Sequence, residues 1–367
     1  MELDETQLHT TCSKSNAVLL KTSNGCSIPL SETPFRQAEK QYKLTKPERP
    51  GKKRPERTAP SRHGFDDAAN VDTDYSDVVD FQHIESNTQV NQNQMRRLSP
   101  GCFAFDGVPG LLFFPKALSE GEQKMWVEKA LDEYACSPPH PNNRTNLDPS
   151  VTTGPYCAKA NPLRWATLGF SYDWSNKVYN PTRFSPFPEQ LREMILRVVK
   201  TVGEAADKDA QSTTTADVDA KLDHIANSKA SVLCSSYEPQ TAIVNYFPVG
   251  TMMCAHQDLS EPSLHRPLIS ISLGCSAVFL MGTTSRQDKP HAFILRSGDI
   301  VSFAGESRLA FHGVPRILDD CPAYLLPTEN GQPGDDDRIK NLRVNINVRQ
   351  VYDEPQECVR EQRHADP

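Results

Sequence analysis

Several features that would place this 367-residue chain in a familiar class are missing from its sequence. No stretch approaches the ~20 consecutive apolar residues of a membrane span, so we expect no membrane partner. None of the ten cysteines is arranged as Cys-x-x-Cys, which argues against a zinc ribbon. No signal peptide precedes them, and we therefore expect reduced thiols in a reducing compartment.

The distribution of charge argues against two further classes. The net charge of −7 excludes a polycation, so any affinity for nucleic acid must come from a local basic patch. The first 35 residues contain Glu2, Asp4 and Glu5 but no arginine, which argues against a mitochondrial presequence. We expect the protein in the nucleus, the cytoplasm or both.

Residues 1–98 show no sustained hydrophobic periodicity, and we expect them to be disordered. Within them, residues 43–62 hold eight basic and two acidic side chains, and residues 66–80 hold six aspartates with no lysine or arginine. A solvated linker is the simplest interpretation of such runs. A nuclear import signal or a phosphate-contacting arm at residues 51–54 is the alternative.

Residues 99–230 are expected to form an N-terminal extension that mixes strands and helices. Apolar runs predict strands at 108–114 and 163–172. Ser119 and Glu122 form a capping box that opens one helix, and a second helix begins near Pro188. Two segments lack such patterns: 137–162 is predicted to be a loop, and 202–230 an inserted or mobile segment with weak helical character.

From residue 231 to residue 352 the hydrophobic period changes to two, the period of a β-strand. Short strands punctuated by glycine turns predict a double-sheet jelly roll, also called a double-stranded β-helix, so the fold class is α+β and mainly β. The strands are expected at 242–247, 268–273, 277–281, 292–295, 299–303 and 342–351, with a long loop at 319–340 and a disordered tail at 353–367.

Two histidines and a carboxylate in the last third of the chain form a candidate metal site. His256 and Asp258 are two residues apart in an extended segment, so their side chains point the same way. His312 follows 56 residues after His256, enough chain for several strands to fold back. This ligand set is typical of the facial triad of non-haem Fe(II), which leaves positions open for co-substrates. His-x-Asp is weak evidence alone, since His364 and Asp366 repeat it in the tail.

A strand downstream alternates polar and apolar residues between Arg343 and Arg349. One interpretation is an exposed polar face above a buried apolar face. The other is a polar face turned into the mouth of a barrel, where a guanidinium holds a carboxylate through two hydrogen bonds, as a lysine does poorly.

Together these motifs resemble the AlkB family of Fe(II)- and 2-oxoglutarate-dependent nucleic-acid dioxygenases, and in particular its homologue-one branch. The resemblance covers about residues 101–352. The matching segments are 245–248, 256–258, 307–313 and 343–349 for the family, and 163–170, 172–174, 272–282 and 297–300 for the branch.

The resemblance implies a role for each site residue. His256, Asp258 and His312 would hold Fe(II), and Arg343 would pair with the distal carboxylate of 2-oxoglutarate. The remaining roles would fall to Asn245 and Asn345 beside the co-substrate, Arg349 beside the co-substrate and the target base, Trp165 as an aromatic lid on a flipped base, and Phe170, Tyr172 and Ser260 near that base. The helices and strands of the N-terminal extension would form this nucleotide-recognition lid.

Three positions depart from the family pattern. Phe247 replaces a tyrosine, so a hydroxyl expected near 2-oxoglutarate is missing, and the neighbouring Tyr246 would face the other way. Asn347 stands where threonine is usual. Ser260 stands where the bacterial prototype has an acid, which speaks against direct repair of cationic bases, because a cationic base favours a nearby carboxylate.

The resemblance implies a monomeric enzyme that uses Fe(II), 2-oxoglutarate and O2 to demethylate methyladenine or methylcytosine in DNA or tRNA, releasing formaldehyde from N-methyl groups. The base must be single-stranded or flipped. Two alternatives stay open: a protein side-chain hydroxylase on the same scaffold, and a catalytically silent nucleic-acid-binding module. The complete set of triad residues argues against the second alternative.

Overall fold

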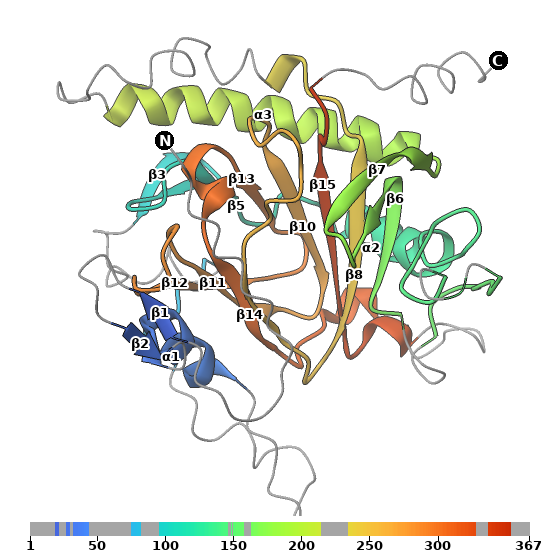
Figure 1. The fold of residues 1–367 in the computed structure, drawn as a ribbon, viewed down its shortest axis with the longest axis horizontal. Coiled ribbons are helices and arrows are strands. Elements are labelled where there is room, and N and C mark those ends of the chain that lie inside the picture. Colours follow the sequence, from blue (N-terminus) through green and yellow to red (C-terminus); the bar gives the residue numbers. More distant parts are fainter. Residues whose placement is uncertain are drawn as a thin grey trace, which may run out of the picture.

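The computed structural model describes residues 19–21, 27–29, 32–43, 75–81, 95–145, 148, 150–157, 163–213, 234–327 and 337–353. Its centre is a pair of facing antiparallel sheets (Figure 1). The large sheet has nine strands in the order β3 (Met95–Ser99), β4 (Cys102–Phe105), β5 (Leu111–Phe114), β13 (Ile300–Phe303), β10 (Leu268–Gly274), β15 (Leu342–Arg349), β8 (Thr241–Pro248), β6 (Trp165–Asp173) and β7 (Val178–Phe184). The small sheet has the order β12 (His291–Leu295), β11 (Ala277–Met281), β14 (His312–Ile317) and β9 (Met253–His256). A separate short pair joins β1 (Leu19–Lys21) to β2 (Ser27–Pro29).

Strand alternation on β15 divides the large sheet into two different faces. Val344, Ile346 and Val348 are fully buried in one cluster with Trp126 of α2 (Glu120–Glu128) and Leu191 of α3 (Glu189–Thr213). The helices therefore cover the outer face of the large sheet, as Figure 1 shows. The polar side chains of β15 point the other way, toward the small sheet.

A second apolar cluster fills much of the space between the two sheets. Phe113 and Val301 from the large sheet meet Phe279 and Phe293 from the small sheet, with the rings of Phe113 and Phe293 5.6 Å apart. Two antiparallel sheets with this core are consistent with the predicted jelly roll.

Helices α2 and α3 begin where the sequence predicts, but α3 extends further than predicted. Ser119 caps α2 and forms the expected reciprocal bonds with Glu122, and the helix then widens into a π-helical turn, η2 (Lys129–Glu133). The segment expected to be inserted or mobile from residue 202 is helical as far as Thr213, because Val199, Val202 and Ala205 continue the buried stripe of α3. Residues 214–233 lie outside the described residues.

Proline and glycine explain three differences between the predicted and the observed strands, namely the start of β5 and the unpredicted strands β7 and β14. Strand β5 begins at Leu111 because Gly110, with φ +83°, makes a turn in which a Cβ would lie 2.0 Å from the carbonyl oxygen of Ala304. Strands β7 and β14 contain Pro181 and Pro315, which argue against a strand in a sequence reading. Both prolines lie in strands whose pairing registers are irregular, where a missing N–H is tolerated.

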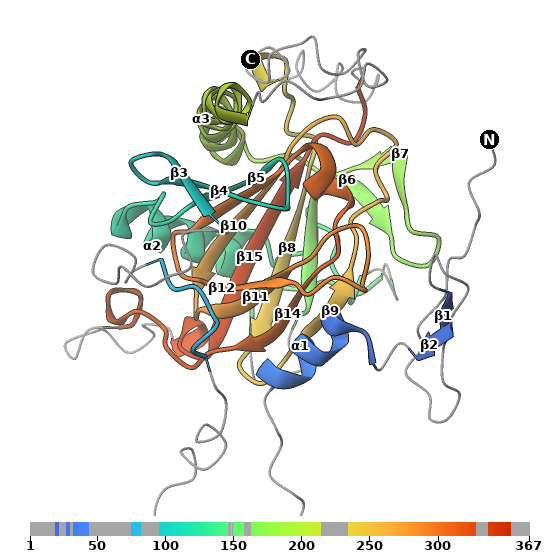
Figure 2. The same cartoon turned by 90° about the vertical axis from the view of Figure 1, so that its left-hand side faces the viewer.

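The expectation of disorder throughout residues 1–98 is wrong for part of that region. Helix α1 (Pro34–Tyr42), capped by Thr33, packs on β14, β11 and β9 of the small sheet (Figure 2). A nine-residue helix with only Phe35, Ala38 and Tyr42 as buried apolar side chains is too short for a periodicity argument to detect.

The end of the aspartate run also has structure. Asp77 accepts a hydrogen bond of 2.6 Å from the hydroxyl of Tyr42, and Asp80 pairs with Arg296 at 2.6 Å. Most of the predicted basic run and the tail after residue 353 lie outside the described residues.

The expected boundary near residue 230 does not separate two units. Strand β5, from the N-terminal extension, pairs with β13, and β6 pairs with β8, so both halves of the chain build one large sheet. None of the helices in the described part of the chain combines the length and the apolar character needed to cross a membrane.

Candidate metal and co-substrate site

The three predicted metal ligands meet at one end of the small sheet. His256 ends β9 and pairs directly with His312 at the start of β14, and Asp258 follows two residues after His256. One ligand atom from each of the three side chains lies within 4.8 Å of the other two. Among the described residues, no other group of three or more histidine, cysteine or acidic side chains is arranged in this way.

Backbone carbonyls hold both imidazole rings in the orientation that ligation requires. Nδ1 of His256 lies 3.0 Å from the carbonyl oxygen of Cys254, and Nδ1 of His312 lies 3.3 Å from that of Ala310. Because a carbonyl only accepts, each Nδ1 must carry the proton, which leaves Nε2 free for a metal. Burial lowers the pKa of His312 to about 4, so this ring stays neutral at neutral pH.

Positive groups keep the Asp258 carboxylate ionised. Burial raises the pKa of Asp258, but the guanidinium of Arg349, at 3.6 Å, and that of Arg308 oppose burial, and the pKa falls well below its ordinary range. Two imidazoles and one carboxylate are a ligand set that suits Fe(II).

A buried acid that the sequence did not point to organises the residues behind Asp258. Glu261 is bonded to Arg349 at 2.6 Å and to Arg308 at 3.0 Å, and both guanidinium groups are almost fully buried. Arg308 also donates to the backbone carbonyl of Asp258 at 2.9 Å. Through Arg349 and Arg308, Glu261 therefore stabilises both the carboxylate and the backbone carbonyl of Asp258. In the sequence, the only feature that could have drawn attention to Glu261 is its position three residues after Asp258.

This network gives Arg349 partners that the resemblance did not imply. The structure pairs Arg349 with Glu261 and Asp258, and its expected place beside the co-substrate and the target base stays a prediction. Burial would lower the pKa of Arg349, yet ionised neighbours, the two carboxylates among them, raise it.

Arg343 has the opposite environment, a buried guanidinium with no acid beside it in the described structure. It is 1% exposed, its Nη2 donates to the hydroxyl of Ser272 at 3.0 Å, and its Nε and Nη1 have no hydrogen-bond partner. Burial lowers its pKa to about 10, so it stays charged at neutral pH. A buried cation with two free donors fits a carboxylate ligand, as 2-oxoglutarate would supply. The inward polar face on β15 is thus confirmed over the exposed one.

Strand register lines up the other predicted residues across the inner face. Trp165 on β6 lies opposite Asn245 on β8, and Asn245 lies opposite Asn345 on β15. Asn345 donates to the hydroxyl of Ser270 and to the carbonyl of Ile271 at 2.9 and 3.0 Å, which fixes its amide. This row connects the aromatic Trp165 to the strand that carries Arg343.

The two neighbouring aromatic residues on β8 take opposite sides, as expected. Tyr246 faces the helices, and its hydroxyl donates to the carbonyl oxygen of Ala130 at 2.6 Å. Phe247 faces inward, with its ring centre 5.8 Å from the guanidinium carbon of Arg343. The missing phenol hydroxyl is therefore not replaced by Tyr246.

Aromatic side chains of β6 and the turn after it form a group beside the metal ligands. The ring centres of Trp165 and Trp174 are 4.8 Å apart, and those of Tyr172 and Trp174 are also 4.8 Å apart. The hydroxyl of Tyr172 lies 2.8 Å from Oγ of Ser260, two residues after Asp258. Trp174 is 39% exposed, so the group opens to solvent.

The placement of Phe170 beside the base is wrong. Phe170 is fully buried against Phe184 and Tyr352, with ring centres 5.2 and 5.1 Å away. Phe170 lies five positions after Trp165, an odd number, so strand alternation sends the two side chains to opposite faces. Past the register shift between Phe170 and Ser171, Tyr172 reaches Ser260.

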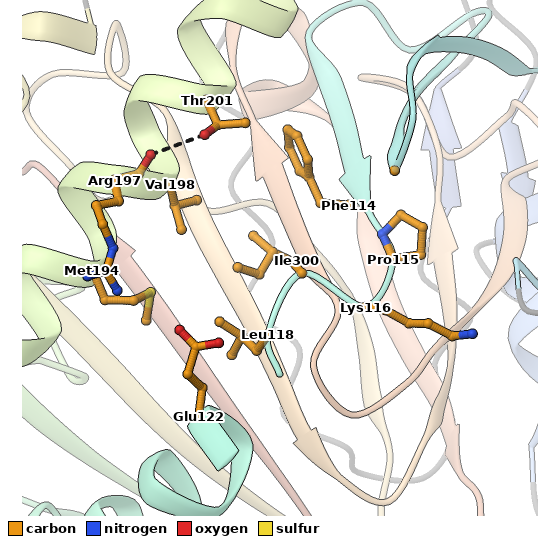
Figure 3. A pocket seen from close by; sticks show the side chains of 12 residues that line it. Phe114, Pro115, Lys116, Leu118, Glu122, Met194, Arg197, Val198, Thr201 and Ile300 are labelled. Atoms are coloured by element: carbon orange, nitrogen blue, oxygen red, sulfur yellow. Dashed lines mark hydrogen bonds between the residues drawn. The ribbon is translucent and has the colours of Figure 1, made fainter. Parts of the chain in front are cut away.

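A cavity of about 360 Å³ lies outside this site, between α3, the start of α2 and β5 (Figure 3). Its apolar lining includes Phe114, Met194 and Ile300, and Arg197 and Glu122 stand among the lining residues. Because it lies on the helix-covered face of the large sheet, it belongs to the outer packing and not to the metal site.

Comparison with protein families agrees with the ligand set. Residues 110–349 match the model of the 2OG-Fe(II) oxygenase superfamily. The chain belongs to this superfamily. It is therefore an oxygenase, and the family implies Fe(II), 2-oxoglutarate and O2. His256, Asp258 and His312 form a candidate site for the metal.

Individual relatives place the chain in the homologue-one branch of the AlkB family. It is 30% identical to the DNA N(6)-methyladenine demethylase ALKBH1A of Arabidopsis thaliana, over 90% of this chain and 99% of that protein. It is 32% identical to the tRNA demethylase abh1 of Schizosaccharomyces pombe, over 77% of this chain and 91% of that protein. Among solved structures, that of OsALKBH1 is 23% identical, with a TM-score of 0.45, and covers 70% of this chain and 99% of its own.

Removing the charge of Glu261 tests the buried network. Glu261→Gln leaves Arg308 and Arg349 without their shared acid, and we expect it to lower the free energy of unfolding by about 3–5 kcal/mol in urea denaturation. The control is Glu133→Gln, which breaks a 3.0 Å pair with Lys129 at a side chain that is 57% exposed. That pair is expected to contribute no more than about 1 kcal/mol. Equal losses in the two variants would contradict the role given to Glu261.

Proposed function

We propose that this enzyme oxidatively demethylates methylated adenine or cytosine in nucleic acid. The observation that carries the proposal is the aromatic group of Trp165, Tyr172 and Trp174 beside the metal ligands. Relatives over most of the chain are named demethylases of DNA N(6)-methyladenine and of tRNA, which supports a nucleic-acid substrate.

Stacking on aromatic side chains gives a nucleobase an attractive surface without a charge requirement. Base-aromatic stacking contributes about 1–3 kcal/mol per base. Trp165 lies on the inner face, in register with Asn245 and Asn345, and Trp174 is the most exposed ring of the group. The hairpin of β6 and β7 is thus the proposed nucleotide-recognition lid. A base must leave a duplex to reach it, so the preferred substrate is single-stranded or flipped.

The environment of Ser260 favours a neutral methylated base. Its hydroxyl is engaged with Tyr172, and the nearest acids, Asp258 and Glu261, are compensated by arginines. Because the two acids closest to Ser260 along the chain are paired with arginines, a cationic base gains little from them.

The residues of the chain divide the chemistry between them. Bound Fe(II), with 2-oxoglutarate and O2, supplies the oxidising power that hydroxylates a methyl group, and a hydroxylated N-methyl group leaves as formaldehyde. His256, Asp258 and His312 would hold the metal, and Arg343 would hold the co-substrate carboxylate. The burial of Arg343 keeps that ion pair away from water and thereby strengthens it.

A comparison of substrates tests the proposed reaction. We expect single-stranded oligonucleotides with N6-methyladenine, or methylated tRNA, to stimulate succinate formation and to lose methyl groups in mass spectra. Unmethylated oligonucleotides and peptides should not. His256→Ala is the control for metal-dependent turnover. Stimulation by peptides alone would identify a protein hydroxylase, and no stimulation by any nucleic acid would refute the proposal.

The co-substrate role of Arg343 predicts a specific kinetic defect. Arg343→Ala should raise the KM for 2-oxoglutarate about 10- to 100-fold, the cost of lost hydrogen bonds to a charged group. High 2-oxoglutarate should restore part of the activity. Arg197→Ala, at the cavity beside α3 and outside the metal site, should leave this KM unchanged. A fall in kcat without any rise in KM would contradict the assignment.

The lid predicts a loss that depends on the substrate. Trp165→Ala should lower kcat/KM for a methylated oligonucleotide about 5- to 100-fold, as the loss of one stacked base predicts. Trp165→Phe keeps an aromatic face and should retain most of the activity. Initial rates over a range of oligonucleotide concentrations measure both variants, and an alanine variant as active as the phenylalanine variant would exclude stacking at this position.

A further inference from the structure

The strand that carries His256 lies at the edge of a sheet. Strand β9 is four residues long and pairs only with β14 in the described structure. The other side of an edge strand presents backbone N–H and C=O groups that need partners. A short strand without such partners would place a metal ligand on a poorly fixed backbone.

Side chains from two distant segments take up the free backbone groups of Ala255, the residue before His256. The amide of Ala255 donates to Oε1 of Glu39 at 2.6 Å, and its carbonyl accepts from Nη2 of Arg286 at 2.8 Å. The other carboxylate oxygen of Glu39 is bonded to Arg36 at 2.6 Å. Glu39 is 1% exposed, so its carboxylate is buried with both oxygens engaged.

Helix α1 is anchored well enough to hold Glu39 in place. Phe35 is fully buried, and its ring packs so closely on Gly282 that a Cβ there would lie 2.9 Å from it. The amide of Phe35 donates to the carbonyl of Arg286 at 3.4 Å. At the other end of the helix, Tyr42 is 1% exposed and bonds to Asp77.

The residues around Ala255 also contact His256 and the residue next to His312. The carbonyl of Cys254, one residue earlier on β9, holds Nδ1 of His256. The guanidinium of Arg286 lies 4.4 Å from the ring centre of Phe311, the residue before His312. A displacement of α1 would therefore move the backbone that sets the orientation of His256.

We propose that Glu39 is a positioning residue of the metal site, acting through the backbone of Ala255 on His256. A buried carboxylate is costly unless it is paired and hydrogen-bonded, and Glu39 uses its second oxygen on the one strand that ends in a metal ligand. The N-terminal helix is then part of the oxygenase site, and this inference holds for any substrate of the enzyme.

Metal affinity of the full-length protein tests the proposal without turnover. Mn(II) is titrated into the protein, and the free ion is followed by electron paramagnetic resonance. Glu39→Leu keeps the size of the side chain but removes the acceptor, and should raise the Kd for Mn(II) about 10- to 100-fold, as loss of a group that orients a ligand does. Glu39→Gln retains an acceptor oxygen and should keep most of the affinity. Glu32→Ala, on the exposed turn before α1, is the control and should bind as the unmodified protein does.

Two results would overturn the proposal. One is a Glu39→Leu protein that melts cooperatively and binds Mn(II) with unchanged Kd. The other needs no variant: hydrogen exchange at the Ala255 amide of the unmodified protein should be as slow as within β14. An Ala255 amide that exchanges like an open edge amide would show that Glu39 does not hold it, and this measurement decides even if Glu39→Leu fails to fold.

Discussion

Both faces of β15 are buried, and this constraint governs the molecule. The apolar side chains pack under α2 and α3, and the polar ones face the small sheet. A strand buried on both faces leaves no solvent for Arg343, Asn345 and Arg349, so each must find partners inside. The candidate metal and co-substrate site lies where these three side chains meet their partners between the two sheets.

The three polar groups are satisfied in different ways, and the differences define function. Arg349 has two carboxylates, and Asn345 has a hydroxyl and a carbonyl. Arg343 has one serine and two free donors. An arginine paired with acids, such as Arg349, stabilises the segment of Asp258, whereas Arg343, with no acid beside it in the described structure, is suited to an anionic ligand.

The position of each metal ligand depends on supports from far along the chain. Glu261 and Arg308 fix the segment of Asp258, and carbonyls of Cys254 and Ala310 orient the imidazoles. Glu39 reaches β9 from more than two hundred residues earlier in the sequence. Residues outside the ligand set thus account for much of the arrangement of the three candidate metal ligands.

The sequence by itself determined the β-rich core, the capped helix at Ser119 and the choice of His256, Asp258 and His312 as candidate metal ligands, but it left the orientation of the polar face at Arg343 open. Period-two alternation and residue chemistry are local properties, and they survive without coordinates. Tertiary structure alone decided the roles of Glu261, Glu39 and Arg349, because ion pairs between distant segments leave no periodic signal. It also moved Phe170 from the site into the core, because only the packing of Phe170 against Phe184 and Tyr352 shows that its face of the predicted strand is buried. The role of helix α1 was likewise decided by the tertiary structure. Its one buried acid, Glu39, acquires a role only through its hydrogen bond to the edge strand β9.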